Sequence, residues 1–169
     1  DKCRLEFMKN LEDDSSNLHS FFIEDLEKAK RINEEHIEYL KNILKEVPKN
    51  AKIFEVGSAS GRDAKLFQSL GYQNIVTSDA VDYFLDILKT AGFSPIKFNL
   101  ITDEFPDKYD FIYCWAVLVH FTKEEAISSI KKMFDSMNNG GKLALSVKCK
   151  KDCDEDWNDR GIGVKRYFS

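Results

Sequence analysis

From residue 52 onwards the sequence alternates between short apolar runs, which favour strands, and longer segments with helical spacing. Such alternation predicts repeated right-handed βαβ units, and therefore a doubly wound α/β domain with a mostly parallel sheet and helices on both faces. Strands are expected over residues 52–56, 74–78, 96–99, 108–116 and 142–147. Helices are expected from a glycine-containing turn to residue 70, over residues 81–90, and over residues 122–137, followed by a turn over residues 138–141.

A helical extension precedes this alternating region. Apolar side chains recur at helical spacing from Leu18 to Ile43, and His36 lies on the same stripe. Pro48 ends the pattern, because the residue before a proline is pushed out of the α region. We therefore divide the chain into an N-terminal helical extension over residues 1–50 and a main domain over residues 51–169.

Charge and cysteine spacing narrow the function. The 169-residue chain has a net charge of −4, whereas nucleic acid binding needs a positive surface. No apolar run approaches the roughly 18 residues of a membrane-spanning helix and no signal peptide is recognisable, so a cytoplasmic protein without a membrane partner is expected. The 4 cysteines and 3 histidines match no zinc spacing. We expect neither a nucleic acid partner nor a metal.

The turn after the first strand carries the residues best suited to bind a ligand. Open parallel sheets bind ligands beyond the carboxyl ends of their strands, where the strand order reverses. Glu55 is followed by Gly57, Ala59 and Gly61 at alternate positions. A dinucleotide fingerprint would need glycine at positions 57, 59 and 62, but positions 59 and 62 hold alanine and arginine. Asp79 ends the second strand, where a carboxylate can bind ribose hydroxyls or cap the next helix.

Several segments carry a family resemblance. Residues 55–61 resemble the motif (D/E)-x-G-x-G-x-G, with alanine at its central glycine, and residues 57–64 with Phe67 resemble G-(S/C)-G-S-G-R-D-A…F. Residues 110–120 are similar to D-x-(I/V)-x-(A/C)-x-x-x-L-x-H. Residues 140–141 match a G-G turn, and residues 166–168 match an R-Y-F segment. From residue 49 to 169 the chain thus resembles class I S-adenosylmethionine-dependent methyltransferases, in particular a small bacterial type. The resemblance implies a Rossmann-like fold and methyl transfer to a small-molecule acceptor.

The resemblance also implies a set of cofactor contacts. The glycine turn would hold the methionine part of S-adenosylmethionine, with Glu55 near its amino group and Asp79 at the ribose. Asn99 would face the adenine amino group, where the family usually has aspartate. Trp115 would lie beside the cofactor in one of two ways. Its aromatic face near the sulfonium would contribute about 0.5–2 kcal/mol, or its ring would pack in the core so that only its backbone touches the ligand. The implied cofactor-binding residues are Glu55, Gly57, Ser58, Ala59, Gly61, Arg62, Asp79, Ala80, Asn99, Leu100, Cys114 and Trp115.

Some alternatives stay open. His120 lies after the fourth strand, where it could act as a general base for the acceptor or orient the loop before the capping box. The departures at Ala59 and Asn99 fit a non-catalytic methyltransferase-like binding module, and a nicotinamide oxidoreductase is a more distant alternative. Class I methyltransferases continue beyond R-Y-F into a helix and two strands, so we expect the C-terminal strands of the fold to be missing from this sequence.

Overall fold

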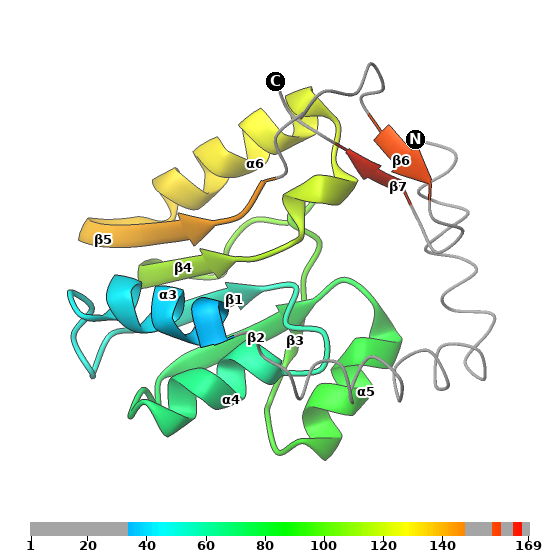
Figure 1. The fold of residues 1–169 in the computed structure, drawn as a ribbon. Coiled ribbons are helices and arrows are strands. Elements are labelled where there is room, and N and C mark those ends of the chain that lie inside the picture. Colours follow the sequence, from blue (N-terminus) through cyan, green and yellow to red (C-terminus); the bar gives the residue numbers. More distant parts are fainter. Residues whose placement is uncertain (1–33, 148–156, 160–163, 167–169) are drawn as a thin grey trace.

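A five-stranded parallel sheet forms the centre of the molecule (Figure 1). The computed structural model describes residues 34–147, 157–159 and 164–166. The strands of the sheet are β1 (Ile53–Val56), β2 (Ile75–Asp79), β3 (Ile96–Lys97), β4 (Tyr109–Cys114) and β5 (Met137–Leu145). Their order is β3-β2-β1-β4-β5, and every neighbouring pair is parallel. The order reverses between β1 and β4, which confirms the predicted doubly wound sheet and places its switch point after β1.

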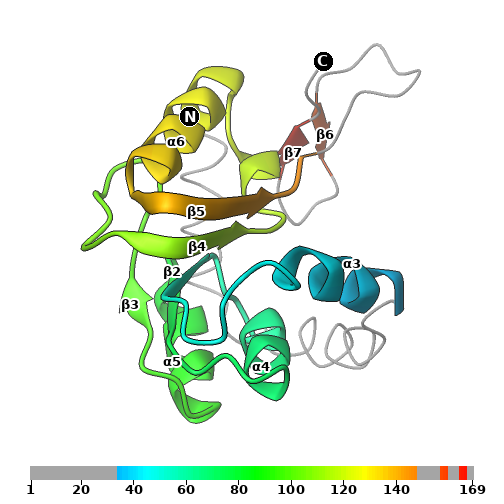
Figure 2. The same ribbon diagram turned by 90° about the vertical axis from the view of Figure 1, so that its left-hand side faces the viewer.

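Helices cover both faces of this sheet. They are α3 (Glu34–Leu44), α4 (Arg62–Ser69), α5 (Asp82–Thr90), α6 (Lys123–Asp135) and a short 3-10 helix, η1 (Leu118–His120). In Figure 2, α6 lies on one side of the sheet, and α3 and α4 lie on the other. The part of the expected N-terminal helix that lies within the described residues is therefore confirmed as α3, and residues before Glu34 lie outside the description.

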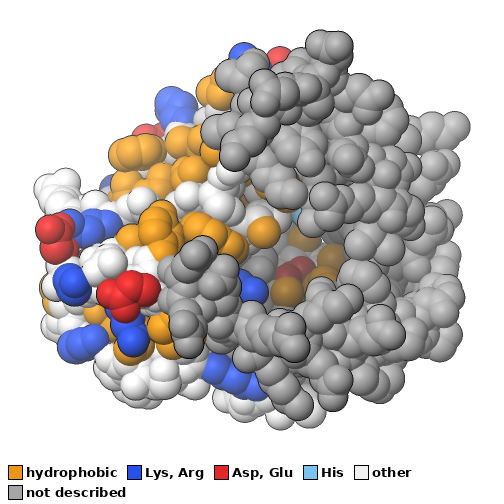
Figure 3. Space-filling view, in the orientation of Figure 1, with side chains coloured by type: hydrophobic (Ala, Val, Ile, Leu, Met, Phe, Trp, Pro, Cys, Tyr) orange, Lys and Arg blue, Asp and Glu red, His pale blue; other side chains and the backbone are white. Residues whose placement is uncertain are grey.

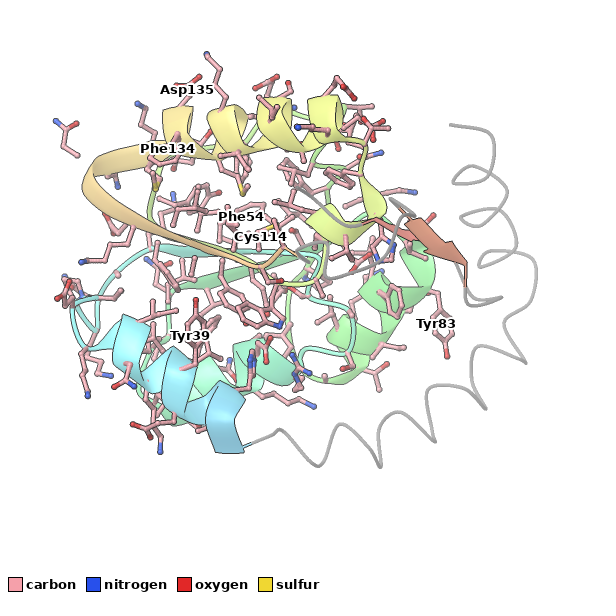
Figure 4. All side chains as sticks on the ribbon, turned by 45° about the horizontal axis from the view of Figure 1, so that its top comes forward. Tyr39, Phe54, Tyr83, Cys114, Phe134 and Asp135 are labelled. Carbon is pink, nitrogen blue, oxygen red and sulfur yellow. The ribbon has the colours of Figure 1, made fainter. Side chains whose placement is uncertain are left out.

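Alternating side chains of the central strands build one apolar cluster on each face. On β1, Phe54 packs towards α6, whereas Ile53 packs with the α3 and α4 side chains. On β4, Cys114 belongs to the α6 cluster and Tyr113 to the other. Figure 4 shows Phe54 and Cys114 in the interior of the molecule, while Phe134 lies on α6 near its outer side. Each large side chain buried in this way contributes about 1.5–3 kcal/mol to folding.

The start of α6 is fixed by the predicted capping box. The Thr122 hydroxyl accepts the backbone N–H of Glu125 at 3.2 Å, and the Glu125 carboxylate accepts the backbone N–H of Thr122 at 2.9 Å. These two bonds satisfy donors that a helix N-terminus otherwise leaves open. The box sets where α6 begins, and so where the chain turns back after β4.

The C-terminal part differs from the sequence prediction at two places. The expected turn over residues 138–141 is wrong, since these residues lie within β5. Met137 pairs with Tyr109 and Lys142 with Phe111, so the extra residues of β5 bulge out, with Gly140 at a φ of 79°. Two strands were not predicted: β6 (Trp157–Asp159) and β7 (Val164–Arg166) form a separate antiparallel pair. Their residues are mostly charged and polar, so they show no apolar alternation.

Candidate functional site

The turn between β1 and α4 has a left-handed backbone at every second residue. The φ angles are 68° at Gly57, 46° at Ala59 and 74° at Gly61. Glycine adopts such angles freely, whereas an alanine there costs about 1–2 kcal/mol. The alternating small residues Gly57, Ala59 and Gly61 are therefore the residues with a left-handed backbone. Ala59 adopts the conformation expected of the glycine that it replaces in the motif.

Asp79, at the end of β2, holds this turn in place. One oxygen of its carboxylate accepts the backbone N–H of Ala59 at 3.0 Å, and the other accepts the N–H of Val81 at 3.0 Å. The side chain is buried, which raises its pKa, and these backbone hydrogen bonds oppose the rise. Ser58 also connects the turn to β2, since its backbone N–H donates to the Ser78 carbonyl at 2.7 Å. The structure thus brings Ser58, Ala59 and Asp79 together.

Glu55 lies buried beside the same turn. Its Cα is paired with those of Thr77 on β2 and Tyr113 on β4. The residue is only 3% exposed, and its Oε2 atom has no hydrogen-bond partner. Burial raises the pKa of this carboxyl to about 8, and hydrogen bonding to Ser58 offsets only part of that rise. The structure therefore leaves one buried acceptor unsatisfied at the predicted site.

Asp63 is the centre of a buried polar cluster that the sequence analysis did not assign. Arg62 donates to both of its oxygens, at 2.8 and 2.9 Å, and the Tyr113 hydroxyl donates at 3.1 Å. Nε2 of His36, on α3, lies 3.2 Å from Oδ1. Burial alone would raise the pKa of Asp63, but the bonds from His36 and Arg62 outweigh it and hold the pKa at about 2. One carboxylate therefore joins α3, α4 and β4.

A signal for this cluster was present in the sequence. His36 lies on the otherwise apolar stripe of its helix, and a polar residue in such a stripe needs a buried partner. Asp63 directly follows Arg62 in the G-(S/C)-G-S-G-R-D-A motif, yet only Arg62 was given a role. The structure pairs Arg62 with this neighbour.

Trp115 lies under α3 at the end of β4. Its ring stacks on Tyr113, with centroids 6.0 Å apart and planes 3° apart. The rings of His36 and Tyr39 approach it at 4.9 and 5.4 Å. The side chain is partly buried in this aromatic group. Cys114, by contrast, is fully buried on the α6 face, where burial raises the pKa of its thiol to about 12.

The remaining predicted residues follow the ends of the neighbouring strands. The Asn99 side-chain oxygen accepts the N–H of Ile101 at 3.1 Å, and Leu100 is buried in the α6 cluster. The backbone N–H of Phe98 donates to the Asp79 carbonyl, so Asn99 leaves β3 close to Asp79. Ala80 follows Asp79 directly and is partly exposed. His120 ends η1 and is partly buried, three residues after Val117.

Gly57 and Gly61 are also required by close packing. A Cβ at Gly57 would lie 2.5 Å from Cγ2 of Val117. At Gly61 it would meet Leu88 at 3.0 Å and Phe93 at 3.1 Å. The space beside each glycine is therefore filled by side chains of the fold, so a substitution at Gly57 changes packing as well as any ligand approach.

Replacement of Ala59 by glycine is expected to raise the free energy of unfolding by roughly 0.5–1 kcal/mol. Stability rises because glycine adopts the left-handed backbone without strain. Part of this gain is lost because glycine has more conformational freedom than alanine in the unfolded chain. Urea unfolding of the two proteins measures the difference. Ala91→Gly, at the end of α5 with a φ of −78°, is the matched control and should lower the stability instead. Equal losses in both variants would contradict the strain at Ala59.

The carboxyl ends of the parallel strands meet at one edge of the sheet. In the space-filling view of Figure 3, hydrophobic and acidic side chains of the described residues are visible near the middle of the molecule. Among the residues that the structure describes, no group of three or more histidine, cysteine, aspartate and glutamate side chains could hold a metal ion. Likewise, none of the described helices combines the length and apolar character needed to cross a membrane.

Comparison with known families decides the classification. A family model described as a methyltransferase domain matches residues 27–166, which is most of the chain. The chain belongs to this family. No curated protein sequence matches this methyltransferase domain.

Several solved structures share its fold. TehB from Haemophilus influenzae matches with a TM-score of 0.61 and 21% identity, over 68% of this chain and 42% of TehB. The magnesium protoporphyrin IX methyltransferase ChlM from Synechocystis PCC 6803, with bound SAH, matches with a TM-score of 0.59 and 18% identity, over 75% of this chain and 61% of ChlM. A DhpI-SAM-HEP complex matches with a TM-score of 0.62 and 12% identity, over 89% of this chain and 82% of the DhpI chain. This methyltransferase domain therefore spans less than two thirds of the TehB and ChlM chains.

Proposed function

We propose that the protein is an S-adenosylmethionine-dependent methyltransferase whose cofactor lies along the turn from Glu55 to Gly61. One observation carries this proposal. In a member of a methyltransferase-domain family, the backbone at positions 57, 59 and 61 is left-handed and is held by Asp79 at the switch point of the sheet. The G-S-A-S-G-R-D-A segment, residues 57–64, supports placement in the small bacterial type.

The residues at this edge fit the parts of that cofactor. The unsatisfied Oε2 of Glu55 is a buried acceptor suited to an amino group. The Asp79 carboxylate accepts the backbone N–H groups of Ala59, Val81 and Ala80, and it retains acceptor capacity for a ribose hydroxyl. The Asn99 side-chain oxygen has one bond, to Ile101, and retains a lone pair for the adenine amino group.

The chain's own residues would mainly bind and orient. When bound, the cofactor supplies a methyl group on an electron-poor sulfonium sulfur. Alignment of two reactants can contribute about 7–11 kcal/mol to such a reaction, so few further catalytic groups are needed. Trp115, His36 and Tyr39 place a group of aromatic rings beside the end of β4. His120 is the proposed proton acceptor for a hydroxyl or thiol of the methyl acceptor.

A small molecule is the proposed methyl acceptor. The structural neighbours include enzymes whose names state a small-molecule substrate, such as magnesium protoporphyrin IX methyltransferase. The formal net charge of −4 favours such a compound over a nucleic acid acceptor.

Ligand-dependent unfolding tests the cofactor assignment. S-adenosylmethionine or S-adenosylhomocysteine at 100 times its dissociation constant should stabilise the protein by about 2.7 kcal/mol. For a domain of this size that corresponds to roughly 5–10 °C in the midpoint of thermal unfolding. NAD at the same concentration should give no shift. A shift with NAD and none with either adenosyl compound would contradict the proposal.

A further inference from the structure

The strongest unexplained feature of the site is the carboxyl of Glu55. It is 3% exposed, and one of its oxygens has no hydrogen-bond partner. A buried carboxylate without a partner costs several kcal/mol, so such a group is either paired with a cation or kept neutral by a proton. Which of the two applies depends on the charges that surround it.

Each element packed around Glu55 contributes its titratable and charged groups. From α4 come Arg62 and Asp63, from β2 Asp79, from β4 Tyr113, and from α3 His36, which contacts Asp63. Arg62 directs both of its described bonds to Asp63, and His36 and Tyr113 also bond to Asp63. The guanidinium, imidazole and phenol groups near Glu55 are thus hydrogen-bonded to Asp63. Asp63 and Asp79 add negative charge near Glu55.

This arrangement leaves Glu55 without a dedicated cation. Burial and the Asp63 charge oppose its ionisation, and its pKa is raised to about 8. In the free protein at neutral pH, the carboxyl is therefore mostly in its protonated, uncharged form. A ligand that brings a positive charge to this point reverses the balance.

We infer that Glu55 exchanges its proton for the ammonium group of the bound cofactor, so that binding is coupled to release of about one proton. The inference rests on the proposed function. The O–H bond of the Glu55 carboxyl breaks, the proton passes to the buffer, and the carboxylate accepts an N–H of the ammonium; nothing is oxidised or reduced. A nucleoside without an amino group leaves Glu55 protonated, so the exchange also selects for ligands with an amino acid end.

Titration calorimetry in two buffers of different ionisation enthalpy measures the exchange directly. At pH 7, S-adenosylhomocysteine should release close to one proton per site, and 5′-methylthioadenosine, which lacks the amino acid end, should release none. Between pH 6 and pH 7 the affinity for S-adenosylhomocysteine should rise about tenfold, because the proton competes less well.

Two variants assign the proton to Glu55. Glu55→Gln is neutral at all these pH values and nearly the same size, so binding of S-adenosylhomocysteine should weaken and the proton release should disappear. Glu124→Gln, at an exposed glutamate on α6, should behave as the unmodified protein. Binding of S-adenosylhomocysteine without proton exchange would overturn the inference and leave the proposed function intact, as would unchanged release in Glu55→Gln. No binding at all would overturn the proposed function itself.

Discussion

Replacement of Asp63 by alanine is expected to lower the free energy of unfolding by about 2–4 kcal/mol, because the buried Tyr113 hydroxyl and the mostly buried His36 ring lose their acceptor. Arg62 adds little to this loss, since 37% of its side chain is exposed and water can replace its ion pair. The guanidinium of Arg62, the hydroxyl of Tyr113 and the ring of His36 all depend on this carboxylate. Urea unfolding at pH 7 measures the loss. Asp86→Ala removes an exposed pair with Lys89 and should cost less than about 1 kcal/mol. Similar losses in both variants would contradict the role of Asp63 in joining α3, α4 and β4.

The same carboxylate predicts an acid-sensitive part of the stability. The pKa of Asp63 is lowered from 3.8 to about 2 in the folded protein. A lowered pKa stabilises the fold fully above pH 3.8, and this stabilisation is lost as the pH falls from 3.8 through 2. Asp63→Asn has no charge to titrate, so its stability should fall less over this window than that of the unmodified protein. Parallel losses in the two proteins would contradict the ionised state of Asp63.

Gly57→Ala is expected to destabilise the protein by about 2–5 kcal/mol. The left-handed backbone accounts for about 1–2 kcal/mol, and the close approach to Val117 adds about 1–3 kcal/mol of overpacking. Gly92 is the matched control, because it has a φ of 89° and a Cβ added there would meet nothing within 4 Å. Gly92→Ala should therefore show only the backbone part, measured by the same urea unfolding.

A double-mutant cycle separates the two parts at Gly57. Val117→Ala removes the methyl group that a Cβ at position 57 would meet, so Gly57→Ala should cost less in that background, by about 1–3 kcal/mol. Additive effects of the two substitutions would contradict the contact between Gly57 and Val117. The result also decides how binding data for Gly57 variants are interpreted, because a lost ligand could otherwise reflect a shifted turn.

The order and type of most elements could be predicted because local signals agreed with the fold. The buried β1 and β4 are short apolar runs bounded by turn residues, and α6 begins at a capping box with a defined hydrogen-bond pattern. The irregular start of β5 could not be predicted, because Asn138, Asn139 and the two glycines favour a turn locally. Pairing with β4 overrides this preference and accommodates the extra residues as a bulge.

The candidate site was predictable where it depends on backbone conformation. Alternate small residues from Gly57 to Gly61 predict a tight turn, and Asp79 follows from its place at the end of a strand. The cluster around Asp63 depends instead on contacts between residues far apart in sequence: His36 is 27 positions from Asp63, and Tyr113 is 50 positions from it. The place of His36 on an apolar stripe indicates that it needs a buried partner, but not which residue that partner is. The partner is set only when the sheet order brings β4 and α3 to the same face.

A structure of the protein with S-adenosylhomocysteine tests the proposed cofactor site most directly. We predict that the ligand lies along the turn from Glu55 to Gly61, with its amino group at Glu55, its ribose at Asp79 and its adenine at Asn99. A ligand bound elsewhere on the molecule, or at this edge with its amino acid end directed away from Glu55, would contradict this placement.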